Sequence, residues 1–403
     1  MSPLSSTPTR GWLRGSRHVA PLAAALVAGL ALVAPPASAV TADQPATPAA
    51  ATTGTAQMQQ ALDQMVDAGV PGALLYTYDK GTVTELQSGS ADLSTGAPMG
   101  PSTTYRIGSQ TKTYVSTAVL QLVARHRIRL DAPARRYLPS LLDRAPHVTV
   151  RQLLNHTSGI YEFNEDPRVL APYLAGDLGH VWKPRQLVKI ALSNEPVSRP
   201  GAEYHYSNAN YVVLGLMIQA VTHKPLGDVL RDGVFAQAGL DSTTFTSSRT
   251  LPAPAAHGYY VAQGDAAGDL TDLTSLYPYP WASGAGVSTA PDVARFYRQL
   301  LARQLLPRHL MAAMMTTNDS SAEDGPGTAY GLGLQSFHTR CGTAWGHGGN
   351  FPGYLTYVYS SPHGSRQVVL MLNEDPMSLP KKKIGPIFMQ LLDQAYCGSP
   401  AGS

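Results

Sequence analysis

The chain lacks the signatures of several protein classes. Its 403 residues contain no H-E-x-x-H motif and no carboxylate–histidine cluster, so we expect neither a metal nor another cofactor. No G-x-S-x-G segment occurs, which excludes the nucleophile elbow of α/β-hydrolases. Basic tracts and clusters of aromatic and basic residues are also missing, so neither nucleic acid nor an acidic membrane surface is an expected partner.

The only long apolar run lies near the N-terminus. It extends from Val19 to Ala34, follows three arginines and precedes Ala37-Ser38-Ala39, an order typical of a secretory signal peptide. We therefore predict a signal peptide over residues 1–39, a secreted, extracellular protein and no membrane anchor. A transmembrane helix is the alternative, but the run is shorter than the roughly 20 residues that a span needs. Without residues 1–39 the chain keeps 27 basic and 27 acidic residues and is near neutral.

Cysteine is scarce as well. The chain has two, Cys341 and Cys397, both in the part that we expect to be exported. A disulfide between them is the natural expectation in an oxidising compartment. It would close a loop of 56 positions and stabilise the fold by roughly 4 kcal/mol in the chain-entropy model. Two inert buried thiols are the alternative.

Beyond the signal peptide we expect one large domain. Residues 40–57 are mostly Ala, Thr and Pro, which predicts a disordered lead-in, and residues 398–403 form a short tail. Between them, residues 58–397 are enough to bury a sizeable core. From about 128 to 280, short helical runs alternate with Pro- and Gly-rich turns, so we expect a mainly helical subdomain there.

Strand patterns lie at both ends of this domain. After a helix over 58–68, residues 73–78 and 82–87 read as one hairpin, and residues 355–359 and 367–372 read as another. Strands at both ends with helices between them predict an α/β (α+β) fold. Its antiparallel sheet would be built from N- and C-terminal strands and flanked by helices.

The segment Gly108-Ser109-Gln110-Thr111-Lys112 opens a helix whose apolar residues follow at helical spacing. Residues three apart share a helix face, so Ser109 and Lys112 lie one above the other and the lysine points to the apolar side. Desolvation would lower the pKa of the amine, which could then take a proton from the serine. The simpler interpretation is an N-cap at Ser109 and a Lys112 side chain that reaches solvent.

Two further motifs occur downstream. Tyr206-Ser207-Asn208 lies in a polar turn before an apolar helix, and His347-Gly348-Gly349 lies shortly before the C-terminal hairpin. Each alone is compatible with simple packing or a turn. In the order S-x-x-K, Y-x-N and H-x-G, however, the chain resembles the serine β-lactamase and penicillin-binding protein superfamily, in the branch with Y-x-N instead of S-D-N.

The resemblance covers about residues 60 to 395. It includes L-L-N-H-T-S-G at 153–159 and Y-G-L-G-L at 330–334, and the ending A-Y-C-G at 395–398 is similar to that of the secreted actinomycete D-alanyl-D-alanine carboxypeptidase. The resemblance implies that Ser109 is the nucleophile that becomes acylated, while Lys112 and the Tyr206 phenolate or hydroxyl share its proton. Tyr206 would then activate the deacylating water. The backbone N–H groups of Ser109 and Asn350 are the implied oxyanion hole.

The resemblance also implies substrate-binding residues. Asn208 is expected to bond the substrate amide, and His347 to replace the lysine of K-T-G relatives, which keeps the pocket electropositive or polar. Trp281 matches a pocket aromatic of the carboxypeptidase, with a core position as the alternative, and His156 is expected to fix a turn. The implied substrate-binding set is Asn208, His347, Gly348, Gly349, Asn350 and Trp281.

Two positions depart from the carboxypeptidase pattern. Gln335 stands where an arginine clamps the terminal carboxylate of the peptide, and loss of such a bidentate contact removes about 1.5–3 kcal/mol of binding free energy. Arg340, beside Cys341, is a candidate substitute. Gly348 stands where the carboxypeptidase has threonine, as in many esterase-like and D-amino-acid peptidase relatives.

These observations predict a secreted serine D,D-peptidase of the D-alanyl-D-alanine carboxypeptidase type. Its expected partners are peptidoglycan stem peptides or related D-amino-acid peptides, with β-lactams as inhibitors or substrates, and we expect a monomer. An esterase or a β-lactamase on the same machinery is the close alternative. An inactive cell-wall-binding protein is the remote one.

Overall fold

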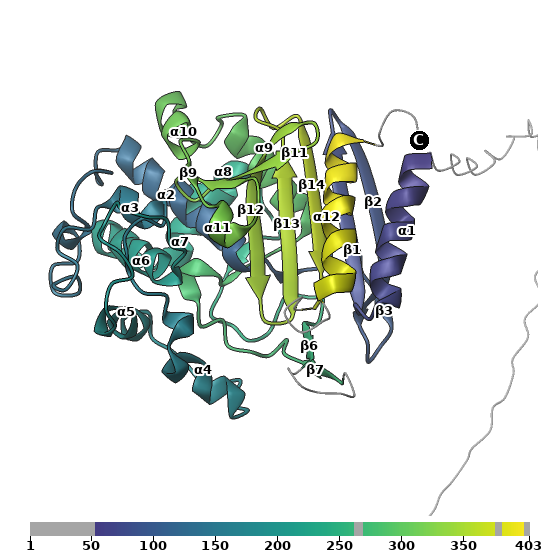
Figure 1. The fold of residues 1–403 in the computed structure, drawn as a ribbon, viewed down its shortest axis with the longest axis horizontal. Helices are drawn as coiled ribbons and strands as arrows, with labels where there is room; N and C mark the ends of the chain where they lie inside the picture. The colour runs from purple at the N-terminus through teal and green to yellow at the C-terminus, as the bar shows by residue number, and fades with distance from the viewer. Residues whose placement is uncertain (1–52, 262–268, 375–380, 399–403) are drawn as a thin grey trace, which may run out of the picture. The chain divides into compact units, whose positions relative to one another are not determined.

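The computed structural model describes residues 53–261, 269–374 and 381–398. Their largest element is an antiparallel sheet with the strand order β3-β2-β1-β14-β13-β12-β11-β10-β9 (Figure 1). The strands are β1 Gly72–Asp79, β2 Thr82–Asp92, β3 Ala97–Pro98, β9 Asn318–Asp319, β10 Thr328–Tyr330, β11 Gln335–Thr339, β12 Gly342–Phe351, β13 Tyr354–Ser360 and β14 Arg366–Leu372. The N-terminal β1 pairs with the C-terminal β14, so the predicted sheet from both ends of the domain is confirmed.

Helices cover both faces of the sheet. Alternate residues of β14 point to opposite sides, so Val368 and Leu370 join one hydrophobic cluster while Val369 and Met371 join the other. The first cluster is covered by α1 (Thr53–Asp67) and α12 (Lys381–Cys397), which pack against each other (Figure 1). The second is covered by α9 (Ala290–Leu301), beyond which the other helices continue the core.

The remaining helices lie largely in the segment predicted to be helical. They are α2 Thr111–Ala124, α3 Val150–Leu154, α4 Pro167–Leu174, α5 Pro184–Ser193, α6 Asn208–Thr222, α7 Leu226–Leu230, α8 Ala236–Ala238, α10 Arg308–Met314 and α11 Ser321–Asp324. Short turns complete them: η1 Gly108–Gln110, η2 Ala134–Arg136, η3 Phe163–Glu165, η4 Arg231–Phe235 and η5 Trp281–Ser283. Helices and sheet belong to one compact unit.

Two small sheets accompany these helices. One has the order β4-β8-β5, and the other pairs β6 with β7. Their strands are β4 Tyr105–Arg106, β5 Thr244–Phe245, β6 Tyr259–Val261, β7 Leu270–Asp272 and β8 Gly286–Ser288. The first sheet bears directly on the Ser109 segment, because β4 ends two residues before Gly108 and is held by β8.

The lead-in predicted for residues 40–57 is too long. Helix α1 begins at Thr53, and the side-chain oxygen of Gln57 accepts a hydrogen bond of 3.1 Å from Gln394 Nε2 of α12. Composition missed this turn because the stabilising partner lies 337 positions away. The predicted signal peptide and residues 399–403 of the predicted tail lie outside the described residues.

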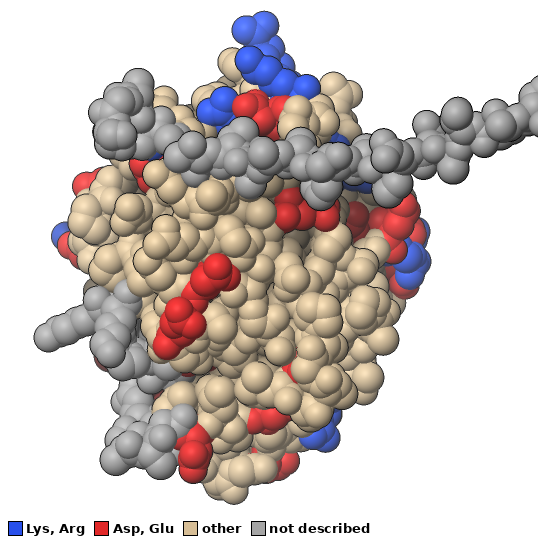
Figure 2. All heavy atoms as spheres, turned by 90° about the vertical axis from the view of Figure 1, so that its right-hand side faces the viewer, with Lys and Arg blue, Asp and Glu red and all other residues tan. Residues whose placement is uncertain are grey.

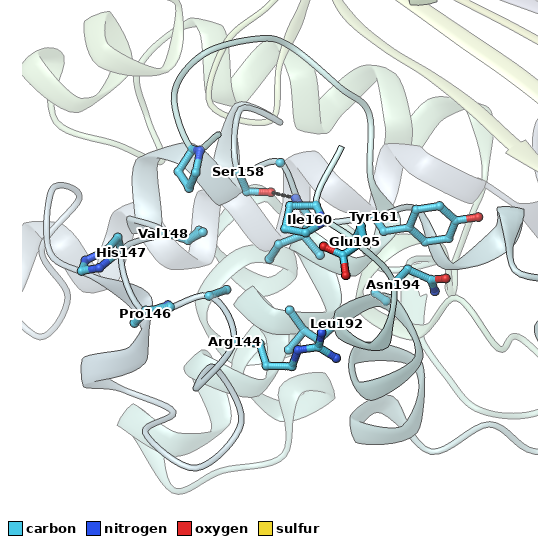
Figure 3. A pocket seen from close by; sticks show the side chains of 15 residues that line it. Arg144, Pro146, His147, Val148, Ser158, Ile160, Tyr161, Leu192, Asn194 and Glu195 are labelled. Carbon is cyan, nitrogen blue, oxygen red and sulfur yellow. Dashed lines mark hydrogen bonds between the residues drawn. The ribbon is translucent and has the colours of Figure 1, made fainter. Parts of the chain in front are cut away.

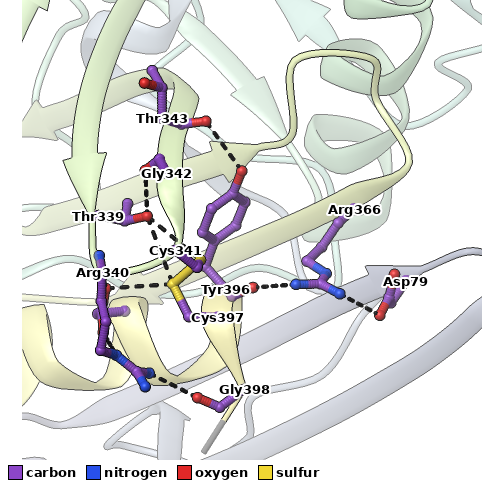
Figure 4. Close-up of a disulfide and its surroundings, with 11 residues drawn as sticks. Asp79, Thr339, Arg340, Cys341, Gly342, Thr343, Arg366, Tyr396, Cys397 and Gly398 are labelled. Carbon is purple, nitrogen blue, oxygen red and sulfur yellow. Dashed lines mark hydrogen bonds and ion pairs between the residues drawn. A yellow bond between two sulfur atoms is a disulfide. The ribbon is translucent and has the colours of Figure 1, made fainter. Parts of the chain in front are cut away.

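A disulfide joins Cys341, between β11 and β12, to Cys397 at the end of α12, as predicted (Figure 4). Charged contacts reinforce it on both sides. Arg340 donates to Asp393 (2.9 Å) and to the carbonyl of Gly398 (2.7 Å). Arg366 of β14 donates to the carbonyl of Tyr396 (2.7 Å). The disulfide and these hydrogen bonds therefore connect the end of α12 to the β11–β12 hairpin and to β14 of the β13–β14 hairpin.

The surface on the α1 and β2 side carries few charges. Figure 2 shows this face largely uncharged, with scattered acidic side chains and with lysine and arginine only towards its margins. Among the described residues, none of the helices combines the length and the apolar character that crossing a membrane requires.

Candidate active site

Ser109 lies on η1, directly against strand β12. The approach is close because Gly108 adopts a left-handed φ of +51°, and a side chain there would collide with the carbonyl of Asn350. Gly349 of β12 also has no room for a side chain, since one there would collide with the carbonyl of Ile107. The two glycines therefore bring the backbone of the serine segment next to Gly349 and Asn350.

Lys112 lies in the first turn of α2, which begins at Thr111, and is completely buried. Its amine donates to Ser109 Oγ (2.9 Å), to Asn208 Oδ1 (2.7 Å) and to the carbonyl of Ser283 (2.9 Å). The predicted inward lysine is thus observed, whereas the N-cap interpretation of Ser109 is wrong, because α2 follows Gln110 and has no side-chain cap.

Burial lowers the pKa of Lys112 to about 7, although the carboxylates of Glu162 and Asp324 act in the opposite direction. Near neutral pH a large fraction of the side chain is therefore the uncharged amine. Such an amine has two hydrogens and one lone pair. Since Asn208 Oδ1 and the Ser283 carbonyl can only accept, they take the two hydrogens, and the lone pair is left facing the hydroxyl of Ser109.

Tyr206 lies on the other side of this pair. Its ring stacks on His156 with centroids 4.3 Å apart and stands 4.8 Å from Lys112 Nζ. Burial raises the pKa of Tyr206 well above its usual 10, and a hydrogen bond with Ser109 only partly opposes this. Of the two forms left open by the sequence, the geometry favours the phenol at neutral pH.

Asn208 is bonded differently from the expectation. Its side-chain oxygen accepts from Lys112, while its amide nitrogen donates to Glu162 Oε1 (2.9 Å) and its backbone N–H donates to Glu162 Oε2. Both ends of the amide thus have a partner within the protein, and its second N–H stays available for the predicted bond to a substrate. The sequence analysis missed Glu162, whose only signal is an isolated acid between Tyr161 and Phe163 shortly after the N-H-T-S-G turn.

His347 is a neutral group in this site. Burial lowers its pKa to about 3, helped by the nearby Lys112. Nδ1 lies at the carbonyl of Gly348, which can only accept, so Nδ1 carries the proton and Nε2 accepts from the hydroxyl of Tyr330 at 2.8 Å. Of the two predicted characters, electropositive or polar, the geometry favours the polar one.

A cavity of about 370 Å³ opens over Ser109. Its walls are Ser109, Tyr206, Glu323, Asp324, Gln335, Phe337, His347, Gly348, Gly349, Asn350, Leu355 and Tyr357. Most of the predicted site is therefore brought together around one space, with Lys112 and Asn208 behind the nucleophile. Lysine and arginine do not occur among the described residues that line it.

Trp281 is not brought to this cavity. Its ring packs against Gly215 of α6, where a Cβ would lie 2.8 Å from Trp281 Cζ3, and against Phe245. Its alternative position, next to the core, is the one observed. The turn η5 still serves the site through the Ser283 carbonyl, a contact that side-chain patterns do not reveal.

Gln335 connects strand β12 to an acidic group. Its side-chain oxygen accepts from the N–H of Gly348 (2.8 Å), and its amide nitrogen donates to Asp324 Oδ2 (3.1 Å). Tyr204 also donates to Asp324 (2.8 Å). Beside it, Glu323 accepts from the N–H of Tyr206 at 2.8 Å. Gln335, which stands in place of the clamping arginine of the carboxypeptidase, therefore lies beside two acids of α11.

Arg340, the candidate substitute for the clamp, lies elsewhere. It pairs with Asp393 of α12 beside the disulfide and does not line the Ser109 cavity (Figure 4). A second cavity, of about 360 Å³, lies between the segments 144–148, 158–161 and 191–196 (Figure 3). Ser109 and Lys112 do not line it, and within the described residues there is no cluster of metal-ligating side chains.

The protein-family model described as Beta-lactamase matches residues 58–384. Penicillin-binding protein 4 of Amycolatopsis lactamdurans is 30% identical over 332 residues, which cover 75% of this chain and 81% of that protein.

Two solved structures extend the comparison. A D-stereospecific amidohydrolase from Streptomyces sp. has 34% identity and a TM-score of 0.76, over 86% of this chain and 99% of that one. The D-amino acid amidase from Ochrobactrum anthropi SV3, solved with D-phenylalanine, has 26% identity and a TM-score of 0.73, over 85% and 100%. The family model matches residues 58–384, which are most of the chain, and Ser109 and Tyr206 line one cavity with Lys112 bonded to Ser109. The chain therefore belongs to the beta-lactamase family of serine hydrolases.

Proposed function

We propose that this protein hydrolyses amides and peptides of D-amino acids through an acyl-enzyme on Ser109. The observation that carries the proposal is the bonding of Lys112: its buried amine faces Ser109 Oγ, and its other two partners are acceptors. A base held in this way can take the proton of the serine as the hydroxyl attacks a carbonyl.

Acylation follows from these contacts. Ser109 Oγ bonds to the carbonyl carbon and its proton passes to Lys112 Nζ. The oxyanion is held by the backbone N–H groups of Ser109 and Asn350. The bond to the leaving amine then breaks as the amine takes the proton of the Tyr206 hydroxyl. The proton that Lys112 holds then passes to the Tyr206 oxygen, which restores both groups.

Deacylation uses water in place of the amine. The water oxygen bonds to the acyl carbon, and its proton passes to the Tyr206 oxygen while the Tyr206 proton passes to Ser109 Oγ. The Ser109–acyl bond breaks, which restores the hydroxyl and releases the acid. No other group has to change its charge.

Two acidic residues of α11 that line the cavity support a preference for substrates with a free amino group. Asp324 and Glu323 line the cavity, while neither lysine nor arginine is found among its described walls. A terminal carboxylate would meet like charge there, and an ammonium group would meet opposite charge. The similar D-amino acid amidase and D-stereospecific amidohydrolase are consistent with this preference.

The D-alanyl-D-alanine carboxypeptidase activity on peptidoglycan stem peptides is the second candidate. It is favoured by the similarity to penicillin-binding protein 4 and by the Ser109, Lys112 and Tyr206 arrangement, which β-lactams could acylate. The replacement of the clamp by Gln335 speaks against it. An esterase or β-lactamase activity would use the same three residues.

Rates on four substrates separate these candidates: D-alanine amide, a peptide that ends in D-alanyl-D-alanine, a short acyl ester and a chromogenic cephalosporin. Intact mass after brief exposure to a penicillin shows whether Ser109 is acylated. We expect the amide to be cleaved faster than the D,D-peptide. Cleavage of none of the four, with no adduct, would leave a binding protein as the answer.

Secretion belongs to the same proposal. It rests on residues 1–39 and is supported by the disulfide, which is typical of oxidising compartments. N-terminal sequencing of protein recovered from the medium should begin at Val40. Recovery of the chain only from inside cells, with Met1 intact, would contradict it.

A further inference from the structure

Glu162 is a buried carboxylate that the mechanism above does not use. It is 7% exposed and accepts hydrogen bonds from the backbone N–H of Asn164 (3.1 Å), the side chain of Asn208 (2.9 Å) and the backbone N–H of Asn208. It does not line the Ser109 cavity. We propose that Glu162 is a positioning residue of the acylation step, which acts through Asn208 to keep the lone pair of the Lys112 amine on Ser109.

The two ends of the Asn208 amide have different partners. An ionised carboxylate can only accept, so the amide nitrogen of Asn208 must face Glu162. The amide oxygen is then turned to Lys112, which must donate to it at 2.7 Å. The Ser283 carbonyl takes the second hydrogen of the neutral amine. The direction of the remaining lone pair is therefore decided by Glu162, which is two hydrogen bonds away from Lys112 and three away from the nucleophile.

Replacing the carboxylate by an amide removes this constraint. In Glu162→Gln the new amide nitrogen can donate to the Asn208 oxygen, and the Asn208 nitrogen then turns towards Lys112. A donor at that place would compete with the Ser109 hydroxyl for the lone pair of the amine. The alternative orientation keeps Asn208 in place but leaves one buried donor without its partner, which is also unfavourable.

The charge of Glu162 acts in addition to its hydrogen bonds. The titratable groups that face Lys112 are Glu162, Asp324, His156, His347, Tyr206 and Tyr211. Burial lowers the pKa of both histidines and raises the pKa of both tyrosines, so these four are neutral around pH 7. The two carboxyl groups remain. Burial raises the pKa of each, while the groups that donate hydrogen bonds to them oppose this and favour the ionised form. As carboxylates, each raises the pKa of Lys112 against the effect of burial.

The experiment measures acylation by p-nitrophenyl acetate, as the burst of p-nitrophenol, from pH 5 to 9. Glu162→Gln should lower the maximal rate about tenfold and move the acidic limb of the profile to lower pH. The same loss should appear with D-alanine p-nitroanilide, because the residue acts on the base and not on the amino group of the substrate. Glu162→Asp, which keeps the charge, should retain the wild-type limb.

Asp166→Asn is the matched control. Asp166 is also buried, at 5% exposure, and also caps a helix start, but it pairs with Arg168 and Asn194 and not with Asn208. It should leave the pH profile unchanged. Thermal melting of each variant separates lost folding from lost positioning, and in the Asn208→Ala background Glu162→Gln should change the maximal rate less than about twofold.

Three results would overturn the inference: an unshifted acidic limb in Glu162→Gln, a loss confined to the amine-bearing substrate, or the same limb shift in Asp166→Asn. The inference rests on the proposed acyl-enzyme, whose failure looks different. Wild-type protein that gives no burst and no adduct, or Ser109→Ala that keeps both, overturns the mechanism itself and this role with it.

Discussion

On the helical side of Ser109 the side chains of Lys112 and Asn208 are bonded to other groups of the protein and are closed off behind the nucleophile. On the sheet side, Gln335 and Asp324 face an open cavity. The first arrangement fixes where a proton can go, and the second offers charges that an incoming molecule can meet. We therefore propose that the helical side carries out the reaction and that the sheet side selects the substrate.

The sharpest way to test this division is to remove the nucleophile. Ser109→Ala should lower the rate on every substrate by at least about 10⁴-fold and abolish the penicillin adduct in intact-mass spectra. Ser116→Ala is a suitable control, because it deletes a buried hydroxyl of α2, the helix that follows Ser109, and this hydroxyl contacts Tyr211. An adduct that persists in Ser109→Ala would move the chemistry to another residue.

Lys112 should be nearly as important. Lys112→Met should slow acylation roughly 10³-fold, since the general base is lost while the apolar stem remains. In the wild-type protein the rate should fall as the pH drops below about 7, because protonation removes the lone pair that faces Ser109. Lys112→Arg, permanently charged, should be as slow as Lys112→Met. A fully active arginine variant would exclude the neutral amine as base.

The two buried bases, Lys112 and His347, differ in their pKa values, which are about 7 and about 3. The folded-state pKa of His347 is about 3, below its usual 6.5, so the unfolded chain binds one more proton between these values. Stability should then fall as the pH drops from about 6 to 4, by roughly 1.4 kcal/mol per pH unit for this group. His347→Gln should remove that part of the slope in chemical denaturation at pH 4, 5 and 6. Parallel slopes for both proteins would show that His347 is protonated in the fold.

The sheet side can be altered without touching the reacting groups. Gln335→Arg should place a cation beside Asp324 and improve the rate on peptides with a free C-terminal carboxylate, relative to D-alanine amide, by about tenfold. The ratio of kcat/KM for the two substrates measures this. Gln335→Glu is the control of opposite sign. If the arginine variant slowed both substrates equally, the sheet side would not choose between them.

The features that the sequence could predict depend on residues close together in the chain. Ser109 and Lys112 are three residues apart on one turn, so local spacing sufficed to bring them together. Strands 355–359 and 367–372 were found because each is a short run of residues with high strand propensity, and they are buried at the sheet centre. Tyr206 could be placed only through the resemblance to a family.

What could not be predicted depends on contacts between distant segments. Glu162 meets Asn208 across 46 positions, and Asp324 meets Tyr204 across 120, while each alone is indistinguishable from a surface acid. The backbone carbonyl of Ser283 leaves no mark in side-chain patterns. Trp281 was assigned to the pocket by a resemblance alone, although its ring packs against Gly215.

Substitution of Arg340 should have the smallest effect on stability and activity. It tests directly whether this arginine takes part in substrate binding. It is a half-exposed partner of Asp393 beside the disulfide, so Arg340→Ala should lower the free energy of unfolding by less than about 1 kcal/mol. The ratio of kcat/KM for the D,D-peptide and D-alanine amide should stay within about twofold of the wild-type ratio. Arg340 precedes Cys341, so free thiols should be counted in the variant. A selective loss of activity on the D,D-peptide, with the disulfide intact, would mean that this arginine contacts the terminal carboxylate. The substrate-binding region would then extend to the end of α12.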